Sequence, residues 1–148
     1  MAYSGKFKPK NYRKYKGDPT RIYYRSLWER TFMDWCDRNP AVIEWSSEEI
    51  IIPYRSPVDK KVHRYFPDFY VKYTNSKGEV KREIIEVKPK RQLSPPKKPK
   101  RRTKNYLNEV KTYAVNQAKF KAAEEYCADR KFTFRFLTED ELLPKKKK

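Results

Sequence analysis

The sequence of 148 residues contains few of the residue types on which several protein classes depend. Its two cysteines, Cys36 and Cys127, are too few for a disulfide scaffold, so we expect reduced thiols in a cytosol-like compartment. A single histidine and no CxxC pair exclude a standard zinc site. The sequence contains no Walker loop and no GxGxxG motif, so no such motif points to a small-molecule cofactor. Because no stretch approaches the roughly 20 apolar residues of a membrane span, and no apolar signal core is present, we expect no membrane contact.

Acidic residues are also scarce relative to basic ones. Lys and Arg number 37 against 19 Asp and Glu, a formal net charge of +18, while 16% of the residues are aromatic. Disordered chains are poor in aromatic residues, so we interpret the chain as a folded basic domain with charged extensions. The basic excess lies in residues 1–25, 88–104 and 145–148. Three such segments favour a polyanionic partner, most simply nucleic acid.

These segments set the expected domain organisation. We expect a basic extended arm over residues 1–25, in which Tyr12 and Tyr15 are candidates for stacking on bases. One domain should follow over 26–144, with an exposed Pro/Lys-rich loop at 89–104, and then a lysine tail at 145–148. The basic residues that we expect to contact DNA are Arg25, Lys97, Lys98, Lys100, Arg101, Arg102 and Lys104.

Hydrophobic periodicity and turn residues predict the secondary structure. The segment Ser26–Glu29 fits a capping box, so a helix should begin there and bury a stripe of Trp28, Phe32 and Trp35. A second, longer helix is expected over 106–130. Strands are expected over 42–45, 50–54, 62–73 with an interruption at Pro67, 80–87 and 132–137. The order α-β-β-β-β-α-β predicts an α/β fold, a mixed sheet flanked by helices.

The sharpest chemical signal lies on two of these strands. Asp68 follows a proline on the first, and Glu86 and Lys88 stand two residues apart on the second, so their side chains share a face. If the two strands pair, two carboxylates and an amine converge at one point. Carboxylates from two strands are the hard ligands that Mg²⁺ or Mn²⁺ uses while keeping positions for water and a substrate phosphate. Lys88 would then orient or deprotonate the attacking water.

Pro67-Asp68 followed by Glu86-Val87-Lys88 resembles the signature of the PD-(D/E)xK nucleases. The resemblance implies a restriction-endonuclease-like fold and divalent-metal-dependent hydrolysis of DNA phosphodiester bonds. It also implies that Glu29, on the first helix, joins Asp68 and Glu86 as a metal-binding acid. Gln117, on the later helix, would match an auxiliary polar residue that some branches use.

Longer segments resemble two groups of these nucleases. Residues 1–6, 24–29 and 65–71 are similar to the small head-completion nucleases of T-even-type tailed bacteriophages, while the central segment and residues 132–139 resemble TnsA-like transposon endonucleases. The first resemblance implies a role in finishing packaged phage heads, with head or neck proteins near the portal as partners. It implies a location in the host cytoplasm during assembly, with incorporation into the virion head or neck as the alternative.

Two other functions remain open on the sequence alone. One is a non-catalytic DNA-binding or virion structural protein that retains the nuclease fold, and the other is an RNA-binding, ribosome-associated protein. The intact trio of Asp68, Glu86 and Lys88 favours an enzyme over both, because a degenerate copy should have lost at least one member. Glu29 has a competing role too, as the capping-box partner of Ser26.

Overall fold

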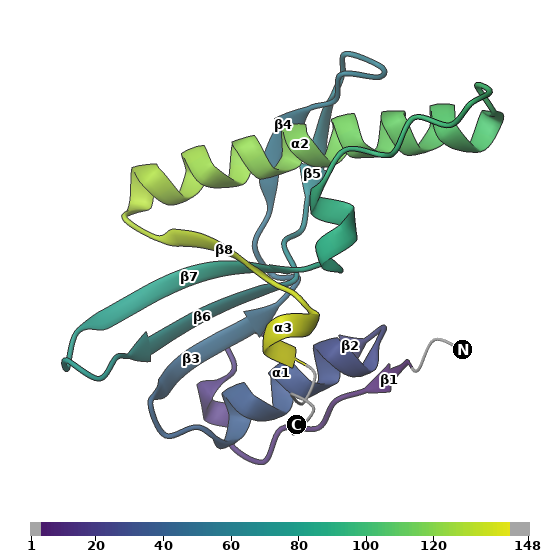
Figure 1. Ribbon diagram of the computed structural model, residues 1–148. Helices are drawn as coiled ribbons and strands as arrows, with labels where there is room; N and C mark the ends of the chain where they lie inside the picture. Colours follow the sequence, from purple (N-terminus) through teal and green to yellow (C-terminus); the bar gives the residue numbers. More distant parts are fainter. Residues whose placement is uncertain (1–3, 143–148) are drawn as a thin grey trace.

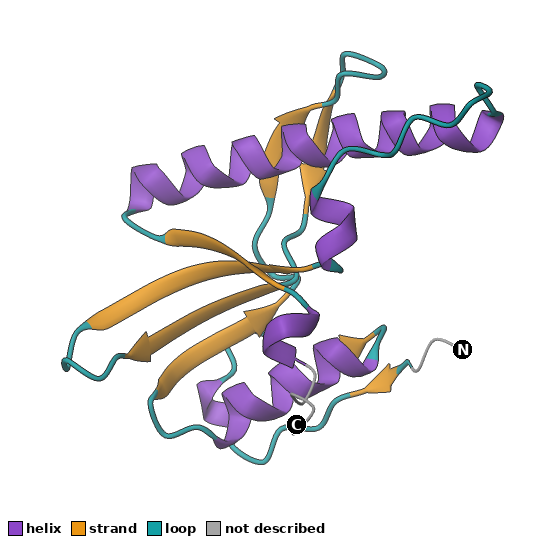
Figure 2. Ribbon diagram, viewed as in Figure 1, coloured by secondary structure: helices purple, strands orange, loops and turns teal. Residues whose placement is uncertain are grey.

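The computed structural model describes residues 4–142, and its centre is a four-stranded mixed sheet (Figures 1 and 2). In the order β3-β6-β7-β8, the first three strands pair antiparallel, and β8 joins β7 in parallel. The expected α/β fold is confirmed, although the expected strand over 62–73 is two strands. The sheet comprises β3 (Val42–Ser47), β6 (Phe69–Thr74), β7 (Val80–Val87) and β8 (Thr133–Leu137).

Alternate side chains along the strands face two different helices. Val71 and Ile85 belong to a core with helix α1 (Leu27–Arg38), whereas Tyr70 and Ile84 pack with the C-terminal part of helix α2 (Lys104–Arg130). Figure 1 shows the two helices on opposite sides of the sheet. The sheet is therefore buried on both faces, so a site built at its edge has a rigid support.

The buried face of α1 differs from the expected stripe. Phe32 is buried, but Trp35 is 45% exposed, and Met33 and Cys36 fill the interface instead. The helix presents a narrow face to the sheet, so Trp35 lies at its margin, where its ring stacks on that of Phe32 with centroids 5.7 Å apart. An aromatic can thus be held at the edge of a core by its neighbour on the helix.

Pro67 divides the expected strand between two separate sheets. The residues before it form β5 (Val62–Tyr65), which pairs with β4 (Ile52–Arg55) in a two-stranded ribbon, and the residues after it enter β6. Proline has no amide to donate and keeps the preceding residue extended, so the chain leaves one ladder and joins another at this point. The ribbon packs on α2 through Ile52, Tyr65 and Ala123. Figure 1 shows it crossing α2 and projecting beyond it.

The N-terminal segment is not the extended arm that its composition suggested. Strands β1 (Gly5–Lys6) and β2 (Tyr23–Tyr24) pair antiparallel, with a 3-10 turn, η1 (Tyr12–Lys14), between them. Three apolar residues of the segment, Phe7, Tyr15 and Ile22, are buried in the core beside Trp45. Most of the basic side chains are exposed around this apolar minority, whose irregular spacing gives no periodic signal. Because Tyr15 is buried and its hydroxyl donates to the Ser47 carbonyl (3.2 Å), it is unable to stack on a base.

Replacing Phe7 with alanine should therefore destabilise the whole domain. Its ring packs edge-on against Trp45 at 5.9 Å and is only 8% exposed, so truncation should cost roughly 3–5 kcal/mol of unfolding free energy. Urea titration followed by tryptophan fluorescence measures this. The control is Tyr12→Ala in the same segment: Tyr12 is 55% exposed, and its replacement should change the stability by no more than about 0.5 kcal/mol. Equal midpoints for Phe7→Ala and the parent protein would mean that the segment is a detachable arm.

The Pro/Lys-rich segment before α2 is exposed, as expected, with one short 3-10 turn, η2 (Lys90–Leu93). Helix α2 begins two residues earlier than predicted, at Lys104, because the Thr103 hydroxyl accepts from Tyr106 N (3.1 Å) and caps it. The short helix α3 (Glu139–Leu142) ends the described chain, and the lysine tail lies outside it. Within residues 4–142, no helix has the length and apolarity to cross a membrane.

Candidate active site

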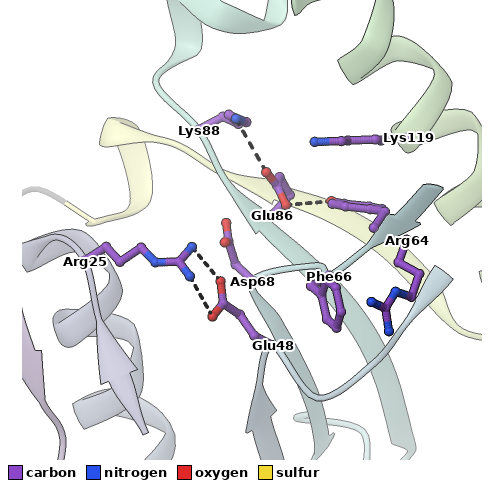
Figure 3. A pocket seen from close by; sticks show the side chains of 9 residues that line it. Arg25, Glu48, Arg64, Phe66, Asp68, Glu86, Lys88 and Lys119 are labelled. Atoms are coloured by element: carbon purple, nitrogen blue, oxygen red, sulfur yellow. Dashed lines mark hydrogen bonds and ion pairs between the residues drawn. The ribbon is translucent and has the colours of Figure 1, made fainter. Parts of the chain in front are cut away.

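A pocket of about 580 Å³ opens where β7 ends and where the ribbon passes into β6. Figure 3 shows the side chains that line it, with carboxylates and amines facing a common space. The sheet, the ribbon and α2 each contribute to its wall. The lining residues are Arg25, Glu48, Arg64, Tyr65, Phe66, Asp68, Glu86, Lys88 and Lys119.

Asp68 lies immediately before β6 and is fixed at both its backbone and its side chain. Val87 N donates to Asp68 Oδ2 (2.8 Å), and Glu48 N donates to the Asp68 carbonyl (3.2 Å). Burial, followed by the charge of Glu86, raises the pKa of the Asp68 carboxyl to about 8. Two acids whose negative charges disfavour each other in one pocket would be stabilised by a bound cation.

Glu86 is buried on β7, where it is 6% exposed. The Tyr65 hydroxyl donates to its Oε1 (2.6 Å), and Lys88 Nζ lies 3.7 Å from its Oε2. Burial raises the pKa of Glu86, while the Tyr65 hydrogen bond and the nearby amines oppose that rise. The structure thus brings Asp68, Glu86 and Lys88 into one pocket, as the strand alternation predicted.

The contribution of α2 comes from Lys119 rather than from Gln117. Gln117 is exposed and is not among the residues that line the pocket, whereas Lys119 lines it and lies over the Tyr65 ring, 5.7 Å from the centroid. Figure 3 shows Lys119 and Lys88 pointing toward each other beside Glu86. Two residues along a helix correspond to a rotation of about 200°, so an error of two positions selects the opposite face.

Glu48 is a pocket acid that the sequence did not indicate. Its backbone is in the left-handed region (φ 55°), an unfavourable conformation for a residue with a side chain. Its carboxylate binds both terminal nitrogens of the Arg25 guanidinium, with Nη1–Oε1 at 2.8 Å and Nη2–Oε2 at 3.3 Å. Arg25, predicted to contact DNA, therefore lines the pocket with its guanidinium already paired. The only sequence signal was the pair of acids that follows β3.

Glu29 is not among the residues that line the pocket and serves as a helix cap. Ser26 Oγ accepts from Glu29 N (3.2 Å) and donates to Glu29 Oε2 (3.2 Å), which completes the predicted capping box in modified form. Burial raises the pKa of Glu29, and its charge contributes to the raised pKa of Asp68. A direct metal ligand role would require Glu29 to give up the cap.

The pocket suits one hard cation held by few protein ligands. Within residues 4–142, no three His, Cys, Asp or Glu side chains come close enough to form a metal cluster by themselves. Two carboxylates, the half-buried Asp68 and the buried Glu86, are nevertheless the number with which Mg²⁺ sites in phosphate-processing proteins are commonly built, the remaining positions going to water and substrate. The raised pKa of both acids shows that their ionised forms are unfavourable in the metal-free pocket, and a bound cation would favour ionisation.

Comparison with known proteins identifies the family. The family described as "TnsA-like endonuclease N terminal" matches residues 39–139, a span that includes Asp68, Glu86 and Lys88. A head completion nuclease of Enterobacteria phage T4 is 47% identical over 146 residues, covering 96% of this chain and 95% of that protein. Because the family match spans more than half of the chain and the relative aligns along nearly all of it, the chain belongs to the TnsA-like endonuclease family of nucleases.

Proposed function

We propose that this protein is a divalent-metal-dependent deoxyribonuclease that hydrolyses DNA phosphodiester bonds during phage head completion. The observation that carries the proposal is the convergence of Asp68, Glu86 and Lys88 in one pocket of a TnsA-like endonuclease domain. The name of the T4 relative supports the head-completion role. That role implies action in the host cytoplasm during assembly and contact with head or neck proteins, with incorporation into the virion as the alternative.

Asp68 and Glu86 would hold Mg²⁺ or Mn²⁺, and Glu29 would assist through water. The bound ion would lower the pKa of a coordinated water and neutralise phosphate charge. Lys88, 3.7 Å from Glu86, would orient the attacking water or accept its proton, and would balance the charge of the phosphate. Tyr65 keeps Glu86 in position through its hydroxyl donor, and burial together with the Glu86 charge raises the pKa of Tyr65, so that donor stays protonated.

Metal-dependent nicking of a supercoiled plasmid tests the proposal. We expect conversion to the open-circular form in Mg²⁺ or Mn²⁺ and none in EDTA. Glu86→Gln keeps the size of the side chain and still accepts from Tyr65, so it is the matched inactive variant. Nicking that persists in EDTA or in Glu86→Gln would contradict the assignment of the site. A purified protein that binds DNA without cutting it under any metal would instead support a structural role in the virion.

The loop before α2 should contribute to DNA binding but not to chemistry. Changing the exposed Lys97, Lys98 and Lys100 to Gln should weaken binding and reduce the slope of log K against log salt by roughly 0.9 for each phosphate that the loop no longer neutralises. Cleavage at saturating DNA should be unchanged, because these residues do not line the pocket. Fluorescence anisotropy across a salt series measures the slope.

The matched control removes three charges at the other end of the sheet. Lys77, Lys81 and Arg82 are exposed on and beside the β6–β7 turn, away from the end of β7 that carries Glu86. Their replacement by Gln should leave the salt slope unchanged. If both triple variants alter the slope equally, binding responds to overall charge and the loop is not a specific DNA contact.

A further inference from the structure

Phe66 is an exposed aromatic ring on the wall of the catalytic pocket. It is 40% exposed, although Tyr65 before it and Pro67 after it are almost fully buried. It stands two residues before Asp68, and Figure 3 shows its ring between Asp68 and Arg64. Packing within the chain leaves much of this ring open to solvent, so its surface is free for a ligand in the pocket.

The backbone around Phe66 holds the ring in a fixed place relative to the two acids. Pro67 restricts the backbone of Phe66 to extended conformations. On one side, the Tyr65 hydroxyl is bonded to Glu86, and on the other, Asp68 accepts from both Val87 N and Glu48 N. The backbone that carries the ring is therefore preorganised, which lowers the entropic cost of binding a ligand against the ring.

The group beside the ring is the guanidinium of Arg64, a cation that can contact the phosphate backbone of a nucleic acid. The guanidinium carbon of Arg64 lies 5.9 Å from the centroid of the Phe66 ring, and both side chains line the same pocket. An aromatic face next to a basic group is the combination with which proteins hold single-stranded nucleic acid, the ring stacking on a base and the cation meeting the backbone.

We propose that Phe66 stacks on an unpaired base adjacent to the scissile phosphate, and that DNA with unpaired nucleotides at the cleavage position is the preferred substrate class. In a continuous duplex, both faces of each base are covered by neighbouring base pairs, so only a base that has left the stack offers its face to the ring. The position of the ring beside Asp68 assigns this base to a nucleotide next to the bond that is cut. The inference rests on the proposed nuclease function.

A DNA duplex with a central mismatched bubble tests the preference, because unpaired and paired sites compete within one molecule. The measured quantity is the ratio of cleavage at the bubble to cleavage in its paired flanks, read from end-labelled strands. The full-length protein should favour the bubble, and Phe66→Ala should reduce the ratio by about 5- to 150-fold, the range expected for removing the stacking of one base. Phe66→Trp should retain the preference. Phe66→Leu keeps an apolar side chain without a ring and should abolish it.

Trp35→Ala is the matched control, because Trp35 is an exposed aromatic (45%) that does not line the catalytic pocket. It should leave the ratio unchanged. An unchanged ratio in Phe66→Ala, or full retention in Phe66→Leu, would overturn the stacking proposal.

Binding supplies a readout that does not depend on cleavage. In a Lys88→Ala background, a 2-aminopurine in the bubble should change its fluorescence on binding, and the further change Phe66→Ala should abolish this response. Protein that nicks paired DNA but gives no Phe66-dependent response refutes the inference alone. Protein that cuts no DNA under any metal refutes the proposed nuclease function, while the fluorescence still tests stacking.

Discussion

Asp68→Asn is expected to abolish cleavage while stabilising the metal-free protein at alkaline pH. Asparagine still accepts from Val87 N but carries no charge to bind a cation. Removing a residue that only hydrogen-bonds a metal ligand already lowers metal affinity or activity by about 10–100-fold. Removing a ligand itself should therefore reduce the rate of single-turnover cleavage by at least about 10²-fold. The stability gain arises because Asp68 is partly desolvated and lies in the same pocket as Glu86, where its charge is unfavourable.

The pH dependence of this gain follows from the direction of the pKa shift. An acid whose pKa rises on folding, here to about 8, destabilises the folded state progressively between the unfolded value near 4 and the folded value. Relative to Asp68→Asn, the parent protein should lose up to about 1.4 kcal/mol of unfolding free energy for each pH unit of rise within that window. Below the window, the unfolding free energies of the two proteins should depend on pH in the same way. Denaturant unfolding at pH 4.5 and pH 8 in EDTA measures this. Mg²⁺ should restore stability to the parent only. Equal stability of the two proteins at pH 8 would contradict the buried charge.

Lys88→Ala should separate catalysis from metal binding. The amine does not ligate a metal, so metal affinity should be retained or increased when a neighbouring positive charge is removed. The rate should fall by about 10²–10⁴-fold, the typical contribution of a positioned proton-transfer group. Lys88→Arg should not restore the rate, because a guanidinium is forked and does not readily release a proton.

Calorimetric titration of the metal and single-turnover cleavage at saturating metal measure these two effects. Both measurements should also be made on Lys119→Ala and compared with Lys88→Ala, since the Lys119 amine lines the same pocket from α2 rather than from the end of β7. Cleavage by Lys88→Ala at the parent rate would make Lys88 a spectator and the match at residues 86–88 accidental.

The parts of the site that were predictable are those encoded by local alternation. Glu86 lies near the end of β7, Lys88 directly follows that strand, and Asp68 follows a proline just before the neighbouring strand β6, so strand pairing alone brings them together. The bounds of β7 agree with the prediction because a turn with Gly78 at positive φ starts it and Pro89 follows it.

The remaining parts depend on how distant elements dock. The face of α2 that meets the pocket is set by the ribbon against which it packs, so the polar residue in the expected stripe, Gln117, was a poor guide and Lys119 had no distinguishing signal. Glu48 reaches the pocket through a positive φ that no sequence pattern indicates. The basic composition of the first 25 residues concealed Phe7 and Ile22, which are core residues.

The parallel pairing of β7 with β8 also determines when the nuclease can become active during its synthesis. Strands β6 and β7 are joined by a short turn and can pair early, whereas Glu83 pairs with Thr133, beyond the whole of α2. Pairings between residues so distant along the chain form late. Lys119 reaches the pocket only once α2 has docked. A nascent chain that already carries Asp68, Glu86 and Lys88 therefore lacks the complete pocket until its C-terminal part has left the ribosome.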